Sequence, residues 1–191
     1  MANQDAAFGM KAIGKVGQNP DNQGLSEYSI SASATAIYQW DLVKMKADGS
    51  VEVAGAGGGV VGSLNGVFYT DASTSKPTWA NHLVASNTAA DIVGFVSDDP
   101  YERFEVQSNN AGASALTDIF NVADIAYAAG STPDYVSKVE LDDSTLAVGS
   151  SATLQILGVS KDPSNNDVAS ANVNWVVRIN EHQFALNANG V

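Results

Sequence analysis

Apolar and polar residues alternate along much of this chain, which is the pattern of β-strands with one buried face. The longest alternating run places Val173, Trp175, Val177 and Ile179 on one side of a strand, and polar residues occupy most positions between them. Burying each large apolar side chain contributes roughly 1.5–3 kcal/mol, so this run is predicted to form a central strand. Shorter runs of the same kind occupy residues 27–32, 103–107, 138–141 and 154–156. Together they predict a mainly β protein.

The clearest local signal is a β-hairpin centred on Asp48 and Gly49. Apolar and charged residues alternate over Val43–Ala47 before this pair, and the alternation resumes over Ser50–Val53 after it. An Asp-Gly pair readily adopts the positive φ angles that a tight hairpin turn requires. We therefore expect the two runs to pair as neighbouring strands.

One segment, residues 113–123, favours a helix instead. Its apolar residues Leu116, Ile119, Phe120 and Ala123 recur at helical spacing. Because the segment lies between predicted strands, we expect a single short helix that plugs or caps the β core.

The first 25 residues have no sustained period and contain several glycines and a proline. Isolated apolar residues punctuate this stretch: Phe8, Met10, Ile13 and Val16. We predict an extended N-terminal arm over residues 1–25, which could dock on its own domain or on a neighbouring molecule. A single β-rich domain over residues 26–191 follows, as an antiparallel β-barrel or β-sandwich.

The composition is that of an acidic protein without cysteine. The chain has 191 residues, with 21 acidic against 9 basic side chains and a formal net charge of -12. A surface this negative repels phosphate backbones, because nucleic-acid binding depends mainly on Lys and Arg. Without cysteine, neither disulfides nor thiolate metal sites can form. We expect no nucleic acid among the partners.

The opening residues Met1–Asp5 lack the basic run and apolar core of a secretion signal. No stretch approaches the ~20 apolar residues that a membrane-spanning helix needs. We expect no membrane partner, and a chain that is made and kept in the cytoplasm unless it leaves inside or on a larger particle.

Few residues are candidates for catalysis. The two histidines, His82 and His182, leave little room for a metal cluster, and adjacent strand positions would point Glu181 and His182 to opposite faces. The serine within Gly62–Gly66 lies one residue off the spacing of a nucleophile elbow, and no helical pattern follows. The glycine-rich run Gly55–Gly59 lacks the Lys and Ser/Thr of a phosphate loop, so we expect a hairpin connection there. The sequence predicts no catalytic residue, no cofactor and no enzymatic activity.

No metal site is predicted, although the loop Asp162–Asp167 leaves one alternative open. Its carboxylate and amide oxygens are the ligands that Ca²⁺ prefers, but they lack the spacing of an EF-hand. Acids and asparagines that cap turns are the simpler interpretation.

Two of the tryptophans have distinct predicted environments. Trp175 alternates with core valines and is expected to be buried. Trp79, which follows Lys76-Pro77-Thr78, is expected on the surface, where aromatic residues anchor protein interfaces or stack on sugars.

Several segments, in this order, carry a family resemblance: Met1–Lys11, Tyr69–Asp71 with Lys76–Trp79, Asp91–Gly94 on to Phe104–Gln107, Leu154–Pro163, and Val177–Phe184. They resemble the small head proteins of tailed bacteriophages known as decoration or cement proteins. The resemblance covers most of the chain, and its motifs are structural ones without active-site residues.

This resemblance implies a β-barrel or β-sandwich protein of the virion that sits on the outer capsid surface, often as a symmetric oligomer. Such a protein stabilises the shell by bridging copies of the major capsid protein. The expected partner-binding residues are Phe8, Met10 and Ile13 of the arm, together with Trp79. The alternative is a tail or spike adhesion module that binds a host glycan, for which Trp79 is also the expected contact.

Overall fold

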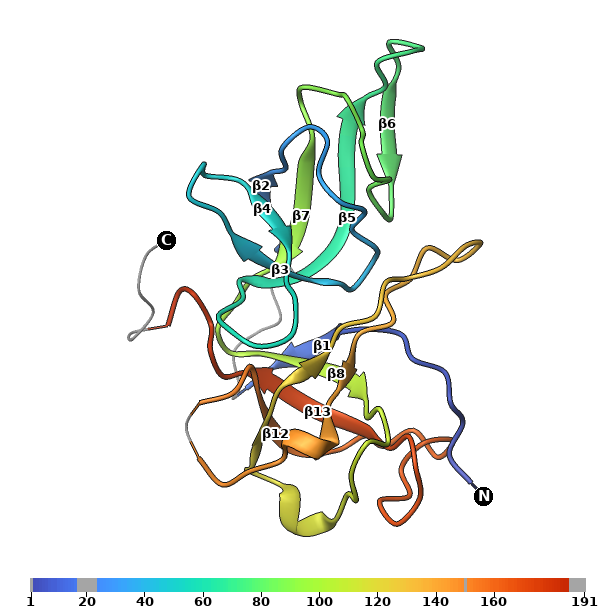
Figure 1. Ribbon diagram of the computed structural model, residues 1–191, viewed down its shortest axis with the longest axis vertical. Helices are drawn as coiled ribbons and strands as arrows, with labels where there is room; N and C mark the ends of the chain where they lie inside the picture. Colours follow the sequence, from blue (N-terminus) through green and yellow to red (C-terminus); the bar gives the residue numbers. More distant parts are fainter. Residues whose placement is uncertain (1, 17–23, 150, 186–191) are drawn as a thin grey trace.

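The computed structural model describes residues 2–16, 24–149 and 151–185, and this part of the protein is mainly β with almost no helix. Its strands form three antiparallel sheets of five, six and two strands. In Figure 1 the six-stranded sheet forms the upper half of an elongated molecule, and the five-stranded sheet lies in the lower half. The predicted mainly β, antiparallel fold is confirmed.

The lower sheet has the strand order β1 (Lys11–Lys15), β8 (Glu102–Gln107), β13 (Asn174–Ile179), β12 (Leu154–Val159) and β9 (Val122–Ala123). The upper sheet has the order β2 (Ser26–Ser29), β7 (Val93–Ser97), β5 (Gly62–Thr70), β3 (Leu42–Met45) and β4 (Val51–Val53), and β6 (Pro77–Ala80) pairs with β5. The small sheet consists of β10 (Ile125–Ala126) and β11 (Glu140–Leu141).

The upper sheet is inserted between two neighbouring strands of the lower sheet. β1 and β8 pair antiparallel, with Lys15 opposite Glu102, yet all strands from β2 to β7 lie between them in the chain. The return from β7 to β8 passes through Asp99, whose carboxylate pairs with the Lys15 ammonium at 2.6 Å. The ends of the insertion are therefore held side by side.

Each large sheet has a hydrophobic core, and the strand predicted from Val173 to Ile179 is at the centre of the lower one. It appears as β13, between β8 and β12. Trp175 and Val177 on its inner face are fully buried, together with Phe104 of β8. The second core lies in the upper sheet, around Val67 and Val96. The prediction of a central strand with a buried Trp175 is confirmed.

The predicted hairpin is also confirmed, with one refinement in its turn. β3 and β4 pair with Val43 opposite Val53 and Met45 opposite Val51. Only Gly49 has a positive φ angle, of 81°, while Asp48 stabilises the turn by accepting hydrogen bonds from the backbone and hydroxyl of Ser50 at 3.0 and 2.6 Å. The turn therefore needs its glycine for conformation and its aspartate for hydrogen bonding.

The helix predicted over residues 113–123 is not formed. A single 3-10 turn, η1 (Leu116–Asp118), occupies its middle. Phe120 leaves the helical path with a φ of 77°, and Val122–Ala123 then pairs with β12 as β9. Pairing with a strand about thirty residues further along outweighs the local helical spacing, because it buries Val122 and Ala123. A second 3-10 turn, η2 (Asp143–Thr145), is capped by Asp142.

A closed barrel is not observed. A single isolated bridge, between Ile30 and Val51, links the two edges of the upper sheet, and no ladder among the described residues closes it. The arrangement of the sheets is consistent with a β-sandwich.

The extended N-terminal arm over residues 1–25 is not confirmed. Lys11–Lys15 is a strand of the lower sheet, and the segment before it docks on its own domain. The side chain of Asn3 donates to two backbone carbonyls of the 167–171 loop, and the side chain of Gln107 both donates to Gln4 and accepts from Ala6. Residues 1 and 17–23 of the predicted arm lie outside the described residues.

The segment after β13 connects the two large sheets. Val60 of the upper half donates to the carbonyl of Glu181 at 3.0 Å and accepts from Gln183 at 2.9 Å. Gly59 permits this approach, since a Cβ there would lie 3.2 Å from the Gln183 side chain and 3.3 Å from the Glu181 carbonyl. The glycine-rich run connects β4 to β5, but the predicted hairpin is wrong there, because β3 lies between these two strands and pairs with both. The last glycine of the run is where the C-terminal segment packs.

Candidate functional site: an exposed aromatic platform

Three aromatic side chains from adjacent strands of the upper sheet gather on its outer face. Phe68 of β5 lies opposite Trp79 of β6, and Phe95 of β7 lies opposite Gly66 of β5. We call Phe68, Trp79 and Phe95 the aromatic platform. It is positioned by strands on either side of β5, the longest strand of the sheet.

The rings of the platform contact one another in sequence, with Trp79 in the middle. The centroids of Phe68 and Trp79 are 4.7 Å apart with tilted planes, and those of Trp79 and Phe95 are 5.3 Å apart and nearly parallel. Such offset arrangements are the favoured ones for aromatic pairs. A Cβ on Gly66 would lie 3.0 Å from the carbonyl oxygen of Ala80, so the glycine lets the end of β6 lie close to β5.

The platform faces solvent although it is apolar. Its strand neighbours Val67 and Val96 point inward and are buried, so the alternation of the strands places Phe68 and Phe95 on the opposite face. These two phenylalanines are half-buried, while 69% of Trp79 is exposed. Large exposed aromatic residues in a cluster indicate an interaction surface.

Two exposed carboxylates border the platform. Glu27 of β2 lies directly opposite Phe95 in the strand register. Asp91, just before β7, accepts hydrogen bonds from the backbone N–H and the hydroxyl of Thr70 at 2.9 and 2.7 Å. These hydrogen bonds lower the pKa of Asp91, so it carries its charge at neutral pH.

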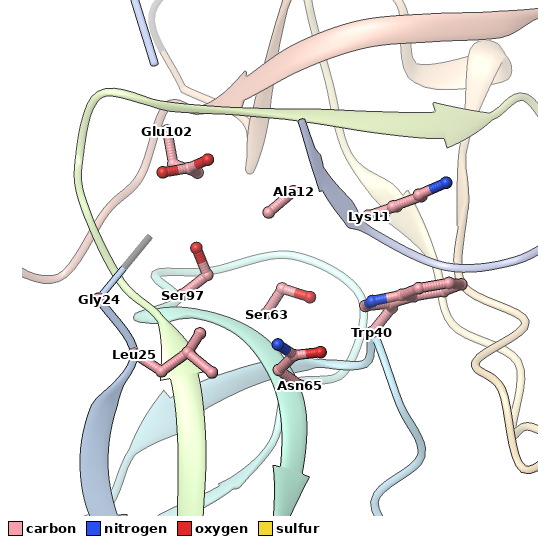
Figure 2. A pocket seen from close by; sticks show the side chains of 9 residues that line it. All are labelled: Lys11, Ala12, Gly24, Leu25, Trp40, Ser63, Asn65, Ser97 and Glu102. Atoms are coloured by element: carbon pink, nitrogen blue, oxygen red, sulfur yellow. The ribbon is translucent and has the colours of Figure 1, made fainter. Parts of the chain in front are cut away.

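Figure 2 shows a pocket of about 250 Å³ between the two large sheets, lined in part by Lys11, Trp40, Ser63 and Glu102. The Ser63 hydroxyl donates to the carbonyl of Met10 at 2.6 Å, and the Lys11 ammonium lies 5.7 Å from the centre of the Trp40 ring. Neither histidine is among the residues that line this pocket. The serine hydroxyl is thus engaged with the backbone, and these contacts stabilise the junction.

Both histidines are engaged in packing. The His82 ring stacks on Tyr135 with centroids 3.8 Å apart and planes 7° from parallel. His182 is buried, and its Nδ1 accepts a hydrogen bond from the backbone N–H of Phe184 at 3.1 Å. Burial lowers the pKa of both imidazoles, which keeps them neutral at pH 7.

The loop Asp162–Asp167 uses its polar groups internally. Asn165 is buried, and its amide donates to the carbonyls of Gln4 and Asn172 at 2.8 and 2.7 Å. Asp162 accepts from the backbone of Ser164, and Asp167 accepts from that of Ala169. Across residues 2–16, 24–149 and 151–185, no group of three or more His, Asp or Glu side chains is arranged to hold a metal ion. The loop is built from capped turns.

The predicted partner-binding residues are not brought together. Met10 is fully buried in the core of the lower sheet, Phe8 is half-buried, and Ile13 is 40% exposed on β1. Trp79 lies on the upper sheet and is the most accessible of the four. Its platform partners Phe68 and Phe95 were missed, although each is the outward residue of an alternating strand segment.

A second exposed apolar group was also missed because its residues were assigned to a helix. Leu116 of η1 and Phe120 just after it are 65% and 72% exposed. We call these two residues the η1 group. In Figure 1 the η1 turn lies at the lower end of the molecule, whereas β6, which carries Trp79, lies near the upper end.

No family model, curated protein or solved structure matches this chain. No residue role can therefore be transferred from a relative. In the described part of the chain, no helix has the length and apolar character to cross a membrane.

Proposed function

We propose that this protein is a virion structural protein that binds the outer surface of a tailed-phage capsid and stabilises the shell by bridging major capsid protein subunits. The observation that carries the proposal is the pair of exposed apolar surfaces, the aromatic platform and the η1 group, at opposite ends of an elongated β molecule. Bridging requires two separate contacts, and apolar patches rimmed by polar residues are typical of protein interfaces.

The charge and the resemblance support the same function. A net charge of -12 suits the outer face of a shell better than a face lined with DNA. The segments that resemble decoration proteins include Lys76–Trp79, which contains the centre of the platform. Modest contacts repeated by the symmetry of a capsid, and by a symmetric oligomer of this chain, add up through their effective concentration.

The test is binding of the purified protein to expanded heads that lack it. We expect saturable co-sedimentation and heads that resist rupture on heating or loss of salt. Trp79→Ala and Phe120→Ala should each weaken binding by about tenfold or more, since exposed aromatic anchors dominate interface energies. Tyr101→Ala is the matched control, because Tyr101 is an aromatic residue with 61% exposure in the turn between the sheets. If heads neither bind the protein nor become more stable, the proposed function is wrong.

A second candidate is a tail or spike adhesion module that binds a host glycan. The exposed face of Trp79 favours it, because an indole face is a suitable platform for a sugar ring. A glycan array probed with the purified protein and with Trp79→Ala distinguishes the two functions. Glycan binding that is lost in the variant, without head binding, would support adhesion.

A further inference from the structure

The aromatic platform combines two features that together select a cation. The face of an aromatic ring carries negative electrostatic potential and attracts Lys and Arg side chains. Glu27 and Asp91 add formal negative charges at two sides of the rings. A purely apolar partner on this surface would bury the two carboxylates without a counter-charge, which is costly. The border therefore disfavours such a partner.

The strand register places Glu27 within reach of a group that lies on the platform. Glu27 and Phe95 are directly opposite each other on β2 and β7, and residues in such pairs have Cβ atoms about 4.5–5.5 Å apart. The Phe95 ring is itself 5.3 Å from the indole of Trp79. The Phe95 ring thus lies between the indole and Glu27, and a long side chain that extends over both rings can contact the exposed Glu27 carboxylate.

Asp91 supplies a second, fixed charge at another side. Thr70 holds its carboxylate through two hydrogen bonds, and Thr70 lies opposite Pro77, which is two residues before Trp79 on β6. Thr70 and Phe68 point to the same face of β5, because they are two residues apart. Lys76 is the basic residue in the turn from β5 to β6, and it lies directly before β6 begins at Pro77.

We propose that the aromatic platform binds an arginine side chain on the surface of the partner protein, with the guanidinium stacked on Trp79 and paired with Glu27. This inference rests on the proposed function, in which the platform contacts the major capsid protein. Arginine is favoured over lysine because its planar, weakly hydrated guanidinium stacks on an aromatic face and can still donate to a carboxylate in its plane.

The direct test uses a defined probe and the full chain. Acetyl-Gly-Arg-Gly-amide is titrated into the protein while the indole N–H resonance of Trp79 is followed by NMR, with Trp79→Phe used for assignment. The peptide in which citrulline replaces arginine has the same shape without the charge. We expect saturable shifts with arginine, weaker shifts with the lysine peptide, and none with citrulline up to about tenfold higher concentration.

Two variants with the same change of charge separate a local pairing from general attraction to an acidic protein. Glu27→Gln should weaken binding of the arginine peptide several-fold, whereas Asp134→Asn, at an exposed acid in another loop, should leave it unchanged. Equal binding of the citrulline peptide, or equal effects of the two variants, would overturn the inference. So would a neutral oligosaccharide that shifts the Trp79 resonance when the arginine peptide does not.

Head binding distinguishes failure of this inference from failure of the proposed function. If heads bind the protein and Trp79→Ala weakens that binding, but Glu27→Gln has no effect at any salt concentration, the platform contacts the capsid without an arginine. If heads do not bind at all, the proposed function fails, whatever the peptide shows.

Discussion

The hydroxyl of Ser63 on β5 donates a 2.6 Å hydrogen bond to the backbone carbonyl of Met10, just before β1, and so joins the upper sheet to the lower one. Both residues are buried. Ser63→Ala leaves the Met10 carbonyl without this donor, and we expect the free energy of unfolding to fall by about 1–3 kcal/mol. Urea unfolding measures the change, with Ser164→Ala at an exposed serine as control. An unchanged midpoint would show that the two sheets do not depend on this contact.

Met10 tests whether the N-terminal segment is docked in solution. Its side chain is fully buried in the lower core, whereas Ile13 on the same segment is 40% exposed. Met10→Ala should cost about 2–5 kcal/mol, because it removes buried contacts and leaves a cavity. Ile13→Ala should cost about 1 kcal/mol or less. Similar small losses in thermal unfolding for both variants would show that Met10 is not docked in the lower core in solution.

Alanine substitutions at Gly9 and Gly49 compare the cost of a strained backbone alone with the cost of strain plus a steric clash. Both have positive φ angles, of 79° and 81°. A Cβ on Gly49 meets nothing within 4 Å, but one on Gly9 would lie 2.5 Å from the Cβ of Ser137 and 2.7 Å from the Trp40 carbonyl. Gly49→Ala should therefore cost about 1–2 kcal/mol and Gly9→Ala about 3 kcal/mol or more in urea unfolding. Equal losses in the free energy of unfolding for the two variants would show that Gly9 does not pack against Ser137.

Asp41 gives the protein a pH dependence with a defined sign. It is fully buried, its Oδ2 accepts from the backbone N–H of Tyr38 at 2.8 Å, and burial raises its pKa from 3.8 to about 6 despite the neighbouring Ser137 hydroxyl. Between these two pH values the folded protein holds the proton more tightly than the unfolded chain, so stability contributed by this group falls as the pH rises. The total change is roughly 2–3 kcal/mol.

Asp41→Asn isolates that effect, because the amide oxygen can still accept from Tyr38. Burial also raises the pKa of Glu140 to about 6, so the wild-type protein and the variant share that second contribution. The expected result is that the free energy of unfolding of the wild type, relative to the variant, declines from pH 4 to pH 6.5 and is flat above it. Parallel pH profiles for the two proteins would contradict the buried, protonatable Asp41.

The sequence predicts those parts of the fold whose signal is local. The Asp48-Gly49 hairpin and the Val173–Ile179 strand each carry their pattern within a few residues, and both are present. The helical spacing from Leu116 to Ala123 misleads, because β9 is decided by its pairing with Leu154 and Gln155. The N-terminal segment has no period of its own, and its position is fixed by distant contacts with Gln107 and Ser63. The sequence therefore could not predict where it docks.

The candidate site is predictable only in part, for the same reason. Trp79 stands out as an exposed tryptophan two residues after Pro77, but its contacts with Phe68 and Phe95 need the register of β6, β5 and β7. That register includes an irregularity at Asn65, which shifts Gly66 opposite Phe95. No pattern along the chain specifies such a shift.

Electron microscopy of tailed-phage heads incubated with this protein tests the proposed position on the outer capsid most directly. The account predicts density for the elongated β molecule on the outside of the capsid, with β6 and the η1 turn touching different copies of the major capsid protein. Density for the protein inside the shell, or on the tail alone, would contradict it.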